Sequence, residues 1–116
     1  MKNEQRKLED RRGLRFPFSA SAEIIPQGSR QGSPAHVSEL SFRGCFLETC
    51  SAMKEHQRMH LKIFFQDQFF ETPAEVLYVR PNGLGLVFGE TNPHFRHVIQ
   101  DWILTAMDAH PTPEEV

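Results

Sequence analysis

Three arginines stand directly before the first apolar stretch of the chain. They are Arg11, Arg12 and Arg15. A guanidinium group is a planar, permanent cation that can fork onto phosphate oxygens and lie flat on a purine. These arginines therefore suit a small anion or an acidic surface, with Arg12 in an auxiliary role. The alternative is a charged terminus that is only solvated.

A second polar segment covers residues 39–44. Glu39 and Ser41 are two positions apart, so on a strand both would project from the same face. A carboxylate can accept two hydrogen bonds at once, and a hydroxyl can donate to a phosphate or a carbonyl. Gly44 would permit an unusual backbone conformation and the close approach of a ligand, and Arg43 is an auxiliary or solvated residue.

Other kinds of site are not indicated. The chain has no nucleophile elbow and no acid–base pair, so we expect no catalytic residue and no enzyme activity. His56 and His60 lack an acidic or cysteine partner at metal-site spacing, so we expect no metal and no other cofactor. Cys45 and Cys50 would face opposite sides of one strand, which argues against a disulfide.

Charge is unevenly distributed along the 116 residues, whose net charge is −2. Residues 1–15 hold six basic and three acidic side chains, whereas the rest of the chain holds seven basic and twelve acidic ones. A basic arm on an acidic body does not suit DNA, and a barrel that binds single-stranded nucleic acid is a weaker alternative. No apolar run is long enough to span a membrane and no secretory signal is visible, so the expected location is the cytoplasm.

The pattern of apolar residues predicts β structure over most of the chain. Every second residue from 16 to 24 is apolar, which is typical of a half-buried strand, and Pro17 suggests an edge position. Asn82 and Gly83 predict a hairpin turn, and Pro73 predicts a bend. The further expected strands cover residues 35–40, 45–49, 59–65, 69–80 and 84–88.

The last part of the chain changes to helical spacing. Its apolar residues recur on one helical face, with Asn92 as N-cap and Pro93 at the first position. The members of this face are Phe95, Val98, Ile99, Trp102, Ile103, Ala106 and Met107. We expect this face to dock on the strands, with a seam in a homodimer as the alternative. Strands followed by one helix predict an all-β barrel or sandwich with a docked helix.

The order and spacing of the two polar segments resemble the PilZ family, whose members bind the bacterial second messenger cyclic di-GMP. That family carries RxxxR, then [D/N]xSxxG on a barrel surface, then a glycine-rich hairpin. Arg11 and Arg15 match the first motif, and Ser41 and Gly44 match the second. Glu39 stands where the family has Asp or Asn, which is a departure from the pattern.

The resemblance implies a fold, a ligand and a set of roles. The fold would be an all-β, six-stranded antiparallel split barrel with a C-terminal α-helix. Arg11 and Arg15 would bind phosphate and stack on guanine, Glu39 would read a guanine edge, Ser41 would support it, and Gly44 would shape the turn. Together with the charge and apolar patterns, the resemblance predicts a basic arm over residues 1–15, a barrel over 16–90, an amphipathic helix over 91–110 and a flexible tail over 111–116.

The implied function is non-catalytic binding of one cyclic di-GMP or a stacked pair. Binding would order the arginine arm, and the ordered arm would signal to an unidentified bacterial protein partner. The alternative is a degenerate PilZ-like adaptor that binds no nucleotide and acts by protein contact in motility or pilus assembly. Glu39 is the residue that favours this alternative.

Overall fold

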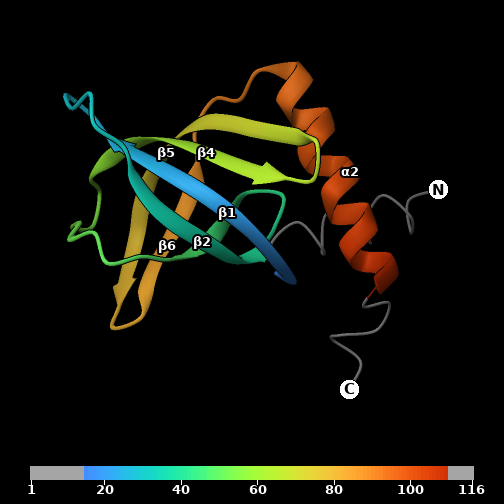
Figure 1. Cartoon of the computed structure of the whole chain (residues 1–116), viewed down its shortest axis with the longest axis horizontal. Coiled ribbons are helices and arrows are strands. Elements are labelled where there is room, and N and C mark those ends of the chain that lie inside the picture. Colours follow the sequence, from blue (N-terminus) through green and yellow to red (C-terminus); the bar gives the residue numbers. More distant parts are fainter. Residues whose placement is uncertain (1–14, 110–116) are drawn as a thin grey trace, which may run out of the picture.

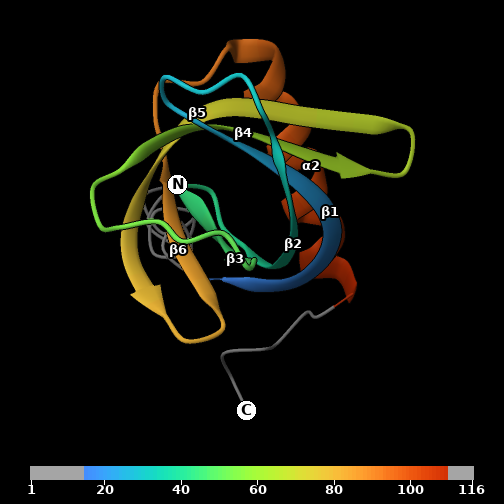
Figure 2. The same cartoon turned by 60° about the vertical axis from the view of Figure 1, so that its left-hand side comes forward.

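Within the described residues, six antiparallel strands form a closed barrel with a helix across one end (Figure 1). The computed structural model describes residues 15–109. The elements are β1 (Phe16–Pro26), β2 (Ser33–Leu40), β3 (Gly44–Glu48), β4 (Arg58–Phe65), β5 (Gln68–Arg80), β6 (Gly83–Phe88) and α2 (Pro93–Ala109). The order around the ring is β1-β2-β3-β6-β5-β4, which Figure 2 shows from a second direction. This architecture confirms the predicted fold class.

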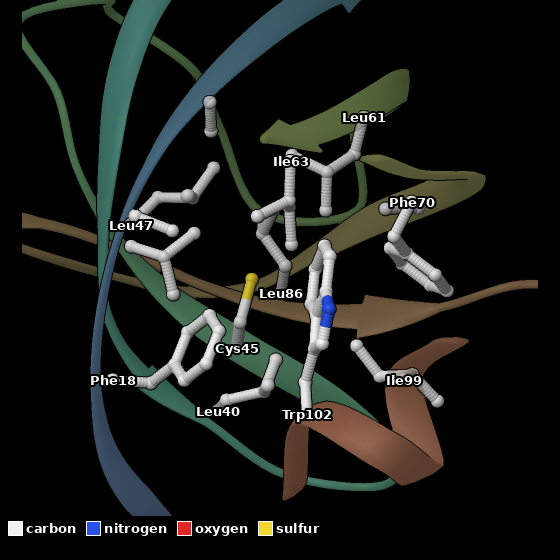
Figure 3. Close-up of a cluster of buried hydrophobic side chains, with 14 of the residues drawn as sticks. Phe18, Leu40, Cys45, Leu47, Leu61, Ile63, Phe70, Leu86, Ile99 and Trp102 are labelled. Atoms are coloured by element: carbon white, nitrogen blue, oxygen red, sulfur yellow. The ribbon is translucent and has the colours of Figure 1, made fainter. Parts of the chain in front are cut away.

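The hydrophobic core fills the inside of the barrel. In β1 the residues that alternate toward the inside are buried, while their neighbours face solvent or are half-buried, as the sequence pattern predicted. Leu61 and Ile63 of β4 are completely buried, and Leu86 of β6 packs into the same cluster (Figure 3). The strands are therefore held by a continuous apolar interior, which fixes which side chains remain on the outer wall.

Helix α2 closes one end of this interior through Trp102. β1 pairs with β4 only from Ser21 to Pro26, so its first residues diverge from β4. The indole of Trp102 lies 5.6 Å from the ring of Phe18 and 5.5 Å from that of Phe65, and its N–H donates to Gln68 at 3.0 Å. Trp102 is only 2% exposed, so the apolar face of α2 docks on the barrel. The alternative that this face forms the seam of a homodimer is therefore wrong.

The start of α2 follows the sequence prediction. The side-chain oxygen of Asn92 accepts a hydrogen bond from the backbone N–H of His94 at 2.8 Å, which is N-cap geometry. Pro93 occupies the first helical position. Among residues 15–109, no helix is both long enough and apolar enough to cross a bilayer.

Two details of the strands differ from the prediction. Arg80 pairs with Gly83, so the β5–β6 turn consists of Pro81 and Asn82, and Gly83 already belongs to β6. The irregularity in β5 is a register shift between Val76 and Tyr78 rather than a bend at Pro73. Pro17 lies in the part of β1 that β4 does not reach, which explains how proline is accommodated there.

Candidate ligand-binding site

The fold brings Arg15 and Glu39 together on the outer wall of the barrel. Arg15 directly precedes β1, and the first residues of β1 pair with the last residues of β2, Pro17 opposite Glu39. The Arg15 Nη1 atom therefore lies 3.5 Å from Glu39 Oε1, with both side chains partly exposed. The two segments singled out in the sequence meet here. Arg11 and Arg12 lie outside the described residues.

Ser41 does not share the face of Glu39, contrary to the sequence prediction. β2 ends at Leu40, so Ser41 begins the turn that leads into β3. Its hydroxyl oxygen accepts hydrogen bonds from the backbone N–H groups of Arg43 at 3.2 Å and Gly44 at 3.1 Å, and the hydroxyl donates to the Gly44 carbonyl. Ser41 is 5% exposed, so in this structure it stabilises the turn that follows Glu39.

Gly44 is required for close packing between strands. A Cβ atom at this position would run into the backbone carbonyl of Leu86 on β6. Its backbone is not in the left-handed region, since the one glycine with a positive φ among the described residues is Gly28. The expected unusual conformation at Gly44 is therefore absent, and the backbone that approaches closely is that of the neighbouring strand.

An aromatic surface lies beside the Arg15–Glu39 pair. The rings of Phe46 and Tyr78 are 6.4 Å apart and nearly parallel, at 28°. Both residues lie opposite Gly85 of β6, and a Cβ atom at Gly85 would collide with the Tyr78 ring. The missing side chain at Gly85 thus leaves room for the tyrosine to lie across the strand.

Two guanidinium groups flank the Tyr78 ring. The central guanidinium carbon lies 4.3 Å from the ring centre for Arg80 and 5.2 Å for Arg15, within the range of cation–π attraction. The sequence interpretation missed both Tyr78 and Arg80. Their only signal was the single tyrosine two positions before an arginine. The alternation of a regular strand does not predict the orientation of these two side chains, because the register shift beside Tyr78 reverses the faces to which they point.

These side chains surround an open hollow of about 370 Å³. Its lining residues are Arg15, Ser38, Glu39, Phe46, Glu48, Tyr78, Arg80 and Asn82. Two cations face two carboxylates, so the described part of the hollow is electrically balanced. Arg43 does not line it and projects elsewhere as an exposed side chain.

The neighbouring groups act differently on Arg15 and on Cys45 behind it. Partial burial lowers the pKa of Arg15, but Tyr78 and Glu39 outweigh that effect and raise the pKa above its ordinary value, so Arg15 stays a cation. Complete burial raises the pKa of Cys45 to about 12, against a smaller lowering by Arg15. The Cys45 thiol is therefore protonated, and within residues 15–109 both cysteines are free. No metal-binding cluster of His, Cys, Asp or Glu is present in that same range.

Comparison with known proteins supports one family. The family model described as "PilZ domain" matches residues 6–105. No curated protein sequence matches the chain significantly. The PilZ domain of CeSA from a cellulose-synthesizing bacterium superposes with a TM-score of 0.63 at 10% identity, covering 84% of this chain and 99% of that chain. The PilZ domain of Escherichia coli YcgR, solved with c-di-GMP, gives 0.64 at 12% identity, covering 85% and 95%.

Proposed function

We propose that this chain, which belongs to the PilZ domain family, is a non-catalytic receptor for cyclic di-GMP. The observation that carries the proposal is the position of Arg15. Its guanidinium group lies between the Glu39 carboxylate at 3.5 Å and the Tyr78 ring at 5.2 Å. A cation, a guanine-compatible acceptor and a flat aromatic surface therefore converge at one hollow. The structurally similar YcgR domain, described with c-di-GMP, supports the same ligand.

Each part of the hollow suits one part of this ligand. The fork of Arg15 can bind a phosphate and its plane can stack on guanine. The Glu39 carboxylate can accept from the two donors of a guanine edge. Tyr78 and Arg80 offer a further stacking surface, because an aromatic ring or a guanidinium plane packs against any base.

The charge balance of the hollow gives the N-terminal arm a role. Cyclic di-GMP carries two phosphate charges, and the hollow's own two arginines are offset by Glu39 and Glu48. Arg11 and Arg12, which precede Arg15 in the chain, would supply the missing positive charge. Ordering of the arm around the ligand would then carry the signal to a protein partner in the cytoplasm.

Isothermal titration calorimetry with cyclic di-GMP tests the proposal. The full chain should bind saturably, and Arg11→Ala and Arg15→Ala should each weaken binding by more than about tenfold, since each removes a charge-assisted contact. Arg30→Ala is the matched control, because Arg30 is an exposed arginine between β1 and β2 that does not line the hollow. A full chain that gives no heat at high micromolar ligand would remove the proposal.

The degenerate adaptor remains a second candidate, and one contact favours it. Arg15 is already engaged by Glu39, whose side chain is one methylene longer than that of the family's Asp. If this ion pair blocks the ligand, the natural chain will not bind cyclic di-GMP and Glu39→Asp will. If the natural chain binds and Glu39→Asp changes affinity little, the receptor function stands and the adaptor reading is wrong.

A further inference from the structure

A separate open groove lies between α2 and the barrel. Its volume is about 540 Å³, and it shares no lining residue with the hollow. Its lining includes Phe42, Arg43, Phe70 and Phe88 from the barrel and Arg96 and Ile99 from α2. Of the residues in the two sequence motifs, only Phe42 and Arg43, in the turn between Ser41 and Gly44, line this groove.

The base of the groove is apolar and only partly covered. The rings of Phe70 and Phe88 lie 5.1 Å apart, and Phe42 packs against the same core while remaining half-exposed. Ile99 extends this surface onto the helix, where Figure 3 shows it near Phe70 and Trp102. Partly exposed aromatic side chains beside polar ones are typical of protein interaction sites.

One turn of α2 forms a wall of the groove. Arg96, Ile99 and Gln100 are spaced three and four residues apart, so they lie on one helical face. These helix side chains form one side of the groove, and the aromatic rings of the barrel form its base. An extended or helical polypeptide segment fits such a shape.

The charge of the groove is opposite to that of the rest of the surface. Residues 15–109 contain eight Lys and Arg and ten Asp and Glu side chains. Arg43 and Arg96 line the groove, and no carboxylate does. Among the ion pairs formed within the described residues, none involves either arginine. Within the described residues, the groove thus places two cations and no carboxylate around an aromatic base.

We propose that this groove docks an acidic segment of a protein partner. An aromatic or large aliphatic side chain of that segment packs against Phe42 and Phe88, and neighbouring carboxylates pair with Arg43 and Arg96. Charge complementarity selects the partner, because a basic segment would meet the two cations that line the groove. A nucleic acid is disfavoured by the acidic body of the domain.

The groove is physically connected to the turn that follows Glu39. The Ser41 hydroxyl accepts from the Arg43 N–H at 3.2 Å, and the Arg43 carbonyl accepts from the Phe88 N–H at 2.7 Å. A ligand that moves Glu39 therefore acts on a turn that also forms one wall of the groove. This coupling rests on the proposed ligand function, whereas the docking itself does not.

Selection from a random peptide library against the full chain tests the docking. The expected result is a set of peptides that share negative charge and an aromatic or large aliphatic residue. Synthetic copies, followed by fluorescence anisotropy, should bind Arg96→Glu at least about tenfold more weakly. The matched control is Arg30→Glu, which should leave the affinity unchanged because Arg30 lies outside the groove.

A second variant keeps the test independent of any folding defect. Gln100→Lys adds a cation to the groove and should tighten the binding of the same peptides. Three results would each overturn the proposal. The selected peptides could be neutral or basic, the selection could yield no peptides at all, or the peptides could bind wild type and Arg96→Glu equally well. Loss of cyclic di-GMP binding in Arg96→Glu would also overturn it, because the groove would then belong to the ligand site. Calorimetry with cyclic di-GMP reports separately on the proposed function.

Discussion

The guanidinium carbon of Arg80 lies 4.3 Å from the centre of the Tyr78 ring, on the outer wall of the barrel. This pair offers a ligand a preformed flat surface, so Arg80→Ala and Tyr78→Leu should each weaken cyclic di-GMP binding about three- to thirtyfold. Calorimetry measures the effect. Lys62→Ala is the matched control, because Lys62 also lies near aromatic rings, 5.5 Å from that of Phe69, but does not line the hollow. Unchanged affinity in both test variants would exclude this surface from the site.

Glu48 should oppose ligand binding. It lines the same hollow as Arg15 and Glu39, and its carboxylate repels the phosphates of an anionic ligand. Glu48→Gln keeps the shape and removes the charge, so it should tighten cyclic di-GMP binding several-fold at low salt, with a smaller gain at high salt. Glu55→Gln, an exposed carboxylate outside the hollow, serves as the control. Weaker binding by Glu48→Gln would show that the carboxylate contacts the ligand favourably.

Ser41 should matter for stability even without ligand. Its replacement by alanine leaves the N–H groups of Arg43 and Gly44 without their acceptor in a largely buried turn. Ser41→Ala should therefore lower the free energy of unfolding by about 1–3 kcal/mol, measured by denaturant unfolding of the apo protein. Ser38→Ala, at a half-exposed position of the hollow, should change it by less than about 0.5 kcal/mol. Equal effects of the two substitutions would contradict the assigned role of Ser41.

Cys45 should make stability depend on alkaline pH. Burial raises the pKa of its thiol to about 12 from the ordinary 9.0, so above pH 9 the unfolded chain loses a proton that the folded chain keeps. The contribution of Cys45 is fully present below pH 9 and declines as the pH rises toward about 12. The difference in unfolding free energy between wild type and Cys45→Ala should therefore shrink over that range. A difference that stays constant would mean that the thiol is not shielded.

The sequence predicted the barrel and its helix for identifiable reasons. Alternating apolar residues such as Phe16 and Phe18 report directly on which face of a strand is buried. The Asn92 cap and the spacing around Trp102 report directly on the helix. Because one polar segment precedes β1 and the other ends β2, antiparallel pairing of these strands brings Arg15 to Glu39.

The remaining features depend on irregularities that alternation does not reveal. Ser38 of β2 has no paired residue in either β1 or β3, so the register of β2 shifts there. A second register shift, beside Tyr78, places the tyrosine ring on the outer wall. The end of β2 at Leu40 turns Ser41 inward, although a longer strand would have placed it beside Glu39. The groove beneath α2 depends on how the helix packs, which local sequence does not encode.

The closed ring of strands limits how this domain can contact other chains. Within residues 15–109 each strand has a neighbour on both sides over at least part of its length, and Trp102 covers the place where β1 and β4 diverge. Few backbone amides are left for an incoming segment to extend the sheet, which protects the fold against edge-to-edge aggregation. Recognition therefore has to use side chains on the wall and on the helix, so it can be altered by surface substitutions that leave the scaffold intact.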